Sequence, residues 1–561
     1  MSDRLRRILP LMRRLAIAAA VLAGFTPAMA AAPPRPKLVV MIVVDQFSAE
    51  LFQAYRPHFS GGLKRLGGGI AFTGYQSHAA TETCPGHSTI LTGDHPARTG
   101  IVANTWFDVK TGSFLYCVSV PRTADPGARG PTYLRVDTLG DWLKKAEPGA
   151  RVISISGKDR AAIMLGGHHA DAVYWWVDGT GFTTSAYAGP ATRAVARPAQ
   201  AFNRTLFARW RADPPQLWPA SAPAACAPLE RSHLFGQLRL SGEVPPESSK
   251  GVEGGPDFLA SSAFQDQLRT SPIFDPLALD FAARTIDREH LGHGPATDLL
   301  AISLSATDHI GHRYGNGGAE MCVQMEALDR ALGAFLAKLD GLGVPYVVAL
   351  SADHGAMDAA ERASEKGVPA QRIDPAAFVG ALNRHLDTKF ALGYEPLVGS
   401  DPQQLTINIA GNDPGLRARI RDEAVAWLKA RKEVAQVFTA GEVAAAAPPP
   451  GKPADRLSMI ERFHESYVPG RSGDIQVAFA EYVSLGLPRS PGDDVAGHGT
   501  PWSYDRRVPI LFWWPGAPAE ARAEPVETVD IAPTLAAIVG VPTPPVDGGC
   551  LATVAADCPA R

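Results

Sequence analysis

The sequence contains little that would favour a nucleic-acid-binding or membrane protein. Its formal net charge is only −3 over 561 residues, and no run of lysine and arginine follows residue 30, so we expect neither nucleic acid nor an anionic membrane surface as a partner. No apolar stretch beyond residue 30 is long enough to cross a bilayer. There is no Cys-x-x-Cys pair, which argues against a structural zinc knuckle. What remains, with 45% hydrophobic and 20% charged residues, is typical of a globular protein.

The first 30 residues have the parts of a secretory signal peptide. Five arginines accompany an apolar stretch, Leu15 to Phe25, that is too short to span a bilayer. Ala28-Met29-Ala30 then forms a small-residue cleavage site. We therefore predict a signal peptide over residues 1–30 and a periplasmic or secreted monomer without a stable membrane anchor. An N-terminal anchor that stays uncut is the alternative.

Six cysteines follow the predicted cleavage site, and an even number in an exported protein permits disulfides. Cys550 and Cys558 are close in sequence, so we expect them to pair. The pairing of the other four stays open at this point; they are Cys84, Cys117, Cys226 and Cys322.

Short buried-type apolar runs alternate with helical periodicity along most of the chain. This alternation predicts an α/β fold with a mostly parallel central sheet sandwiched by helices. We expect one catalytic domain over residues 31–561, with insertions at about 179–272 and 360–470. The first of these segments is rich in Pro, Gly and Ser, and we interpret it as lying outside the core. Strands are expected at 38–44, 70–75, 151–156, 172–177, 298–305, 345–350 and 507–513, and the longer helices at 138–146, 276–290, 319–339 and 528–539.

Thr83 is the candidate nucleophile. Pro85 suits the first turn of a helix, which places the Thr83 hydroxyl where a helix begins. Exposed N–H groups and the positive end of the helix dipole make such a position a natural anion site. The alternative is that Thr83 only caps this helix.

Potential metal ligands follow three of the expected strands. Asp45 ends the first, Asp308 and His312 follow a second with one helical turn between them, and Asp353 and His354 follow a third. His498, in a glycine-containing loop, adds another nitrogen. Each residue alone is more often a turn or cap residue, but together this mixture of histidine and carboxylate ligands suits zinc.

Together these residues resemble the alkaline phosphatase superfamily, and more narrowly the phosphate-irrepressible bacterial alkaline phosphatases. The resemblance extends over nearly the whole chain after the signal peptide. It rests on the motifs Ala80 to His87, Asn104 with Trp106, Lys158-Asp159-Arg160, Asp308-x-x-x-His312 and Asp530 to Leu535.

The resemblance implies a site with two Zn²⁺ ions. Asp308, His312 and His498 would hold one ion. Asp45, Asp353 and His354 would hold the other, with the Thr83 oxygen as a further ligand. Attack by Thr83 would give a phosphothreonine intermediate, which water then hydrolyses.

The same resemblance implies small phosphate monoesters as substrates. In that family the equivalents of Asn104, Lys158 and Arg160 contact the phosphoryl oxygens, and an arginine can grip two oxygens at once. A phosphodiesterase or nucleotide pyrophosphatase of the same superfamily is the first alternative, and a non-catalytic metal-binding module is the second. A sulfatase is not expected, because Cys84 is followed directly by Pro85 and the required arginine is missing.

Overall fold

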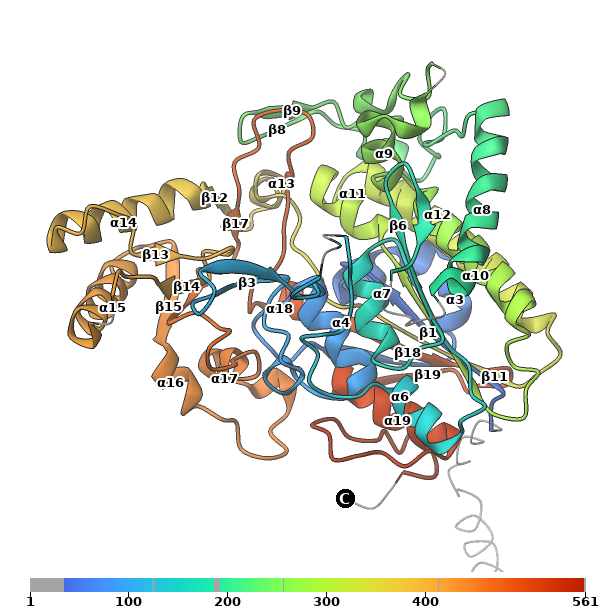
Figure 1. The fold of residues 1–561 in the computed structure, drawn as a ribbon. Helices are drawn as coiled ribbons and strands as arrows, with labels where there is room; N and C mark the ends of the chain where they lie inside the picture. The colour runs from blue at the N-terminus through green and yellow to red at the C-terminus, as the bar shows by residue number, and fades with distance from the viewer. Residues whose placement is uncertain are drawn as a thin grey trace, which may run out of the picture. The chain divides into compact units, whose positions relative to one another are not determined.

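A mostly parallel sheet of nine strands organises the described part of the chain (Figure 1). The computed structural model describes residues 35–123, 125, 127–185, 192–255, 257–411 and 413–558, so the predicted signal peptide lies outside the described residues. The pairs β18–β11, β18–β2 and β6–β7 are antiparallel, and the others are parallel. From edge to edge the strands are β19 (Glu520–Glu527), β2 (Ile70–Tyr75), β18 (Arg507–Trp513), β11 (Tyr346–Ser351), β1 (Leu38–Val44), β10 (Asp298–Leu304), β5 (Val152–Ser156), β6 (Ala172–Val177) and β7 (Gly181–Thr183).

Helices cover both faces of this sheet, which explains why β1 is apolar along its whole length. Val40 and Ile42 of β1 pack with α10 (Phe274–Glu289) and α12 (Ala319–Asp340) on one face. Val39 and Met41 pack on the other face with α4 (Thr83–Thr92), α6 (Leu139–Ala146) and α19 (Ile531–Val539). The predicted fold class, a mostly parallel sheet between helices, is confirmed.

The segment from about 179 to 272 belongs to the main core, and our interpretation that it lies outside the core was wrong. β7 forms an edge of the central sheet. α8 (Thr192–Ala212) buries Phe202, Leu206 and Trp210 in the same apolar cluster as Val40 of β1. The aromatic and aliphatic residues of this segment are spread between Pro, Gly and Ser residues. No regular apolar pattern therefore predicted that they belong to the core.

The segment from about 360 to 470 supplies most of a second, four-stranded sheet. Its strand order is β13 (Leu397–Val398), β14 (Gln404–Ile407), β16 (Ile475–Phe479) and β15 (Val434–Thr439). Two helices, α14 (Pro375–Phe390) and α15 (Pro414–Lys429), share an apolar cluster with this sheet. Residues 400–404 lead into β14 and contact the active-site region, as described below.

Three disulfides join the cysteines in pairs. Cys550–Cys558 confirms the predicted pairing. The other bonds are Cys84–Cys117, beside the candidate nucleophile, and Cys226–Cys322, which ties the segment before α10 to α12. None of the helices in the described part of the chain has the length and apolarity that crossing a bilayer requires.

Candidate active site

The order of the central strands brings the predicted ligands to one edge of the sheet. β1 lies between β10 and β11, and Val43 is in register with Ser303 on one side and Ser351 on the other. Because all three strands are parallel, their carboxyl ends coincide. Asp45 follows β1, Asp353 and His354 follow β11, and α11 (Ala306–Tyr314), which carries Asp308 and His312, follows β10.

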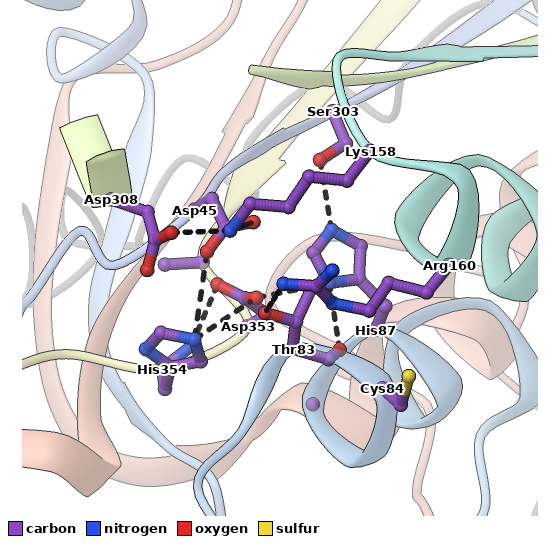
Figure 2. Close-up of polar contacts among 12 residues, drawn as sticks. Asp45, Thr83, Cys84, His87, Lys158, Arg160, Ser303, Asp308, Asp353 and His354 are labelled. Atoms are coloured by element: carbon purple, nitrogen blue, oxygen red, sulfur yellow. Dashed lines mark hydrogen bonds and ion pairs between the residues drawn. The ribbon is translucent and has the colours of Figure 1, made fainter. Parts of the chain in front are cut away.

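Asp45, Asp353 and His354 form the first cluster (Figure 2). The Nε2 atom of His354 lies 3.5 Å from Asp45 Oδ1 and 3.3 Å from Asp353 Oδ2. Its Nδ1 atom lies 3.0 Å from the carbonyl oxygen of Gly355, which can only accept a hydrogen bond. Nδ1 therefore carries the hydrogen, and Nε2 directs a lone pair at the carboxylate oxygens. Such a convergence of lone pairs suits a cation.

Asp308, His312 and His498 form the second cluster. The two imidazole Nε2 atoms lie 3.3 and 3.5 Å from Asp308 Oδ1. Each Nδ1 atom donates to a main-chain carbonyl, that of Ala496 for His312 at 2.9 Å and that of Thr81 for His498 at 2.8 Å. All three histidines thus have the orientation in which the backbone fixes the tautomer and leaves Nε2 free for a metal. His354 also stacks on His498, with ring centroids 3.6 Å apart, so the two clusters adjoin.

The charge balance of the two clusters favours bound cations. Three carboxylates are buried there, those of Asp45, Asp308 and Asp353. The Lys158 ammonium pairs with Asp308 and lies 2.8 Å from Asp45 Oδ2, but one ammonium cannot balance three carboxylates. Asp45 Oδ1, Asp308 Oδ1 and His354 Nε2 accept no hydrogen bond. Buried charges without partners are costly, so the residues present fit a metal ion in each cluster.

The protonation states of His354 and Asp45 agree with this fit, whereas, against the opposing effect of burial, the Asp308 charge raises the pKa of His312 to about 9 and favours its protonated form. Burial lowers the pKa of His354 to about 3 and outweighs the opposing charge of Asp353, so this imidazole stays neutral and can bind a metal. Burial raises the pKa of Asp45, and the neighbouring charges of Asp308 and Asp353 add to that effect. A positive ion between these groups would relieve the repulsion that raises it.

Thr83 is the first residue of α4, and its hydroxyl is buried at the site. Glu82, and not Thr83, occupies the N-cap position, so the alternative that Thr83 serves as the cap is not what the structure has. The Oγ1 atom of Thr83 accepts a hydrogen bond of 3.4 Å from Arg160 Nη2. Gly86 lets α4 approach the segment after β11, because a Cβ atom there would lie 2.1 Å from the Asp353 carbonyl oxygen.

His87 is a site residue to which the sequence reasoning gave no role. Its Nδ1 atom lies 3.0 Å from Asp353 Oδ2 and 2.9 Å from the Thr83 carbonyl oxygen, and its Nε2 atom lies 2.9 Å from Ser303 Oγ. Both neighbours of Nδ1 are acceptors, so Nδ1 carries the hydrogen; it donates to the Thr83 carbonyl oxygen, and the ring lies against the Asp353 carboxylate. A signal was available, because residues four apart share one face of a helix.

Two of the three remaining predicted residues, Arg160 and Asn104, approach the Thr83 segment from other elements. Arg160 lies in the first turn of α7 (Asp159–Gly166), which follows β5. Asn104 precedes a hairpin of β3 (Thr105–Asp108) and β4 (Ser113–Tyr116), and its Oδ1 atom accepts from Cys84 N at 2.8 Å. Lys158 reaches the carboxylates Asp45 and Asp308 rather than the Thr83 hydroxyl (Figure 2).

Two further residues near the site were also missed. The hydroxyl of Tyr116 donates to Asp159 Oδ1 at 2.5 Å, next to Arg160. Glu82 accepts from the backbone N–H of Asn104 at 2.8 Å. Burial, followed by the charge of Asp401, raises the pKa of Glu82 to about 8. The sequence offers no separate signal for Tyr116, and Glu82 is marked only by its place before the nucleophile.

Sequence comparison matches this chain to one protein family and to proteins named alkaline phosphatases. The profile of the type I phosphodiesterase / nucleotide pyrophosphatase family matches residues 39–499. The alkaline phosphatase PhoK of a Sphingomonas species is 42% identical over 541 residues, which cover 94% of this chain and 92% of PhoK.

Comparison with solved structures also gives matches to an alkaline phosphatase. The crystal structure of the alkaline phosphatase PafA superposes with a TM-score of 0.79 at 26% identity, and the match covers 93% of this chain and 99% of PafA. A second PafA structure has a TM-score of 0.77 at 25% identity, and the match covers 92% of this chain and 98% of the other. It is a variant in which a threonine, an asparagine, a lysine and an arginine are replaced.

Proposed function

The chain belongs to the type I phosphodiesterase / nucleotide pyrophosphatase family, within the alkaline phosphatase superfamily, and from this premise we propose that it is an alkaline phosphatase that hydrolyses phosphate monoesters with Thr83 as the nucleophile. One observation carries the choice of nucleophile. The Thr83 hydroxyl is buried at the start of α4, beside the Asp353 carboxylate and within hydrogen-bond distance of Arg160 (Figure 2). A phosphoryl group placed there would meet a nucleophile and a cation together.

The proposed reaction has two displacements at phosphorus. The Thr83 oxygen attacks, the bond from phosphorus to the leaving alcohol breaks, and the alcohol takes up a proton. Water then attacks the phosphothreonine, and the bond to the Thr83 oxygen breaks. Metal ions held by the two clusters would supply positive charge against the attacking and leaving oxygens. We assign zinc to both, because the donors are imidazole nitrogens and carboxylate oxygens.

The chain's own residues would bind and orient the phosphoryl group. Arg160 can donate two parallel hydrogen bonds to non-bridging oxygens, and Asn104 can add a neutral donor. Lys158 adds positive charge between Asp45 and Asp308. His87 lies against Asp353, with its Nδ1 atom 3.0 Å from Asp353 Oδ2. Together they favour a monoester, which carries more non-bridging charge than a diester.

Export is part of the proposal. The predicted signal peptide over residues 1–30 supports it, and so do three disulfides with no free cysteine among the described residues. Disulfides persist in oxidising compartments such as the periplasm.

A phosphodiesterase remains the second candidate, because the matching family profile is named for that activity. The deciding measurement is kcat/KM for 4-nitrophenyl phosphate relative to its methyl diester, on zinc-loaded protein that begins after residue 30. We expect the ratio to lie far above one. A ratio below one would leave Thr83 and the metal ligands in place but assign the enzyme to the diesterases.

Arg160→Ala sharpens this test. We expect about a 100-fold loss of kcat/KM for the monoester, since charge-assisted contacts to the phosphoryl group are removed, and a much smaller loss for the diester. Arg421→Ala, on the exposed side of α15, is the matched control and should change neither value. A larger loss for the diester than for the monoester would invert the substrate assignment.

A further inference from the structure

Asn104 is held by hydrogen bonds at three of its polar groups. Its backbone N–H donates to Glu82 Oε2 at 2.8 Å, and its carbonyl oxygen accepts from Cys117 N at 2.9 Å. Its side-chain Oδ1 accepts from Cys84 N at 2.8 Å. A backbone N–H can only donate, so the amide must turn its oxygen toward Cys84. The two Nδ2 hydrogens are thereby left as the donors that can face a bound substrate.

These contacts come from both sides of the nucleophile. Glu82 precedes Thr83 and holds the backbone of Asn104, whereas Cys84 follows Thr83 and holds the side chain. The disulfide between Cys84 and Cys117 joins the same two segments. These two hydrogen bonds and the disulfide therefore fix the position of the Asn104 amide relative to the Thr83 hydroxyl, as a preorganised site requires.

From this geometry we propose that Glu82 is a positioning residue that sets the amide of Asn104 relative to the Thr83 hydroxyl, so that the recognition of the phosphoryl group depends on a carboxyl group that does not touch the substrate. This inference rests on the proposed function, because it assigns a role to the same site. The inference is specific about the chemical role of Glu82: its carboxyl oxygen acts as the hydrogen-bond acceptor of the Asn104 N–H.

The surrounding contacts indicate that loss of Glu82 would displace Asn104 without unfolding the segment. Ser400 Oγ donates to the Thr105 carbonyl oxygen at 2.5 Å, and Gln404 Nε2 donates to that of Val102 at 3.2 Å. Gln403 Nε2 donates to the Gly499 carbonyl oxygen at 2.9 Å, next to the ligand His498. Residues 400–404 thus support both the 102–105 segment and the loop of His498 when Glu82 is removed.

The experiment compares Glu82→Ala, Glu82→Gln, Glu82→Asp, Asn104→Ala and the double variant Glu82→Ala/Asn104→Ala. The readouts are kcat and KM for 4-nitrophenyl phosphate, the Kd of inorganic phosphate by calorimetry, the zinc content and the thermal midpoint. The matched control is Glu442→Ala, since Glu442 also accepts from a backbone N–H, that of Thr439, but lies on an exposed helix cap.

We expect about a tenfold loss of kcat/KM and weaker phosphate binding for Glu82→Ala, with zinc content unchanged. Glu82→Gln should keep most of the activity because its amide oxygen can accept the same hydrogen bond, whereas Glu82→Asp should resemble Glu82→Ala because its side chain is shorter. In the Asn104→Ala background, removal of Glu82 should cost about twofold or less, since the two residues act as a unit. Glu442→Ala should behave as the wild type.

Several results would overturn the proposal. Independent, multiplicative losses in the double variant would mean that Glu82 does not act through Asn104. A Glu82→Gln variant as impaired as Glu82→Ala would mean that the charge, and not the acceptor, matters. A loss of zinc in all three Glu82 variants would make the residue a structural support of the metal clusters.

A failure of the proposed function would look different. The wild type would then hydrolyse no monoester, or Asn104→Ala would leave monoester turnover unchanged. The phosphate Kd still tests the link between Glu82 and Asn104 in that event, because it needs no turnover. Unequal phosphate Kd values for Glu82→Ala and Asn104→Ala, with additive effects in the double variant, would contradict the link.

Discussion

Two groups of one histidine and two aspartates have the same composition but different chemistry. Asp45, Asp353 and His354 lie at the sheet edge, and Asp137, Asp141 and His168 lie around the start of α6. In each group the candidate ligand atoms lie within 4.8 Å of one another. Residue types and proximity therefore do not show which of the two groups can bind a metal ion.

The hydrogen-bond partners separate them. Asp141 accepts from the backbone N–H groups of His168, His169 and Thr138, at 3.0, 2.7 and 2.8 Å. The Nε2 atom of His168 donates to the Leu134 carbonyl oxygen, and the adjacent Asp141 carboxylate, 3.6 Å from Nδ1, raises the pKa of His168. This group thus works as a helix cap, with Thr138 and Asp141 forming a capping box.

In the sheet-edge group, by contrast, Asp45 Oδ1 and Asp353 Oδ2 accept no hydrogen bond. The His354 imidazole beside them is neutral, since burial lowers its pKa to about 3. The comparison teaches that a metal site is recognised by buried carboxylate oxygens that no protein hydrogen occupies. This holds even where the residue types and spacings agree.

The largest expected effect comes from Thr83→Ala. Removal of the nucleophilic oxygen should lower kcat by about 10³-fold or more. The zinc content should remain near that of the wild type, because the aspartates and histidines supply most ligands. Steady-state kinetics and elemental analysis on one preparation measure both values. Substantial remaining turnover would show that another group is the nucleophile.

The next effect tests the comparison directly. We expect His354→Ala to lower the zinc content and to lower activity in parallel, since Nε2 is a proposed ligand atom. His168→Ala should leave both unchanged. Elemental analysis after equilibration with a zinc buffer is the measurement. Equal zinc loss in the two variants would contradict the distinction between the two groups that rests on their unoccupied carboxylate oxygens.

The smallest effect concerns stability and pH. The folded-state pKa of His168 is raised above its ordinary value of 6.5, so its stabilising contribution is fully present below that pH and is lost as the pH rises through the folded-state pKa. We therefore expect His168→Gln to lower the free energy of unfolding near about pH 6, with a difference from the wild type that shrinks at alkaline pH. Denaturant titrations at both pH values measure it. A difference that grows with pH would contradict the assigned protonation.

Much of the fold followed from local patterns. The limits of β1, β2, β6 and β18 agree with the apolar runs, because strands buried on both faces are apolar throughout. The position of α8 in the core did not follow, since its aromatic residues lie in a segment with many helix-breaking neighbours. The segment from about 179 to 272 therefore needed the tertiary structure.

For the site, the sequence alone determined which residues follow the strands and which one begins the helix after β2. That was enough to place Asp45, Thr83 and Asp308 at a strand end or a helix start, because these are local features. Only the tertiary structure decided which imidazoles keep a free Nε2, since the carbonyls that take Nδ1–H of His312 and His498 belong to Ala496 and Thr81. It likewise brought Glu82 to the backbone of Asn104 and His87 to Asp353, because a polar contact depends on where a distant partner lies.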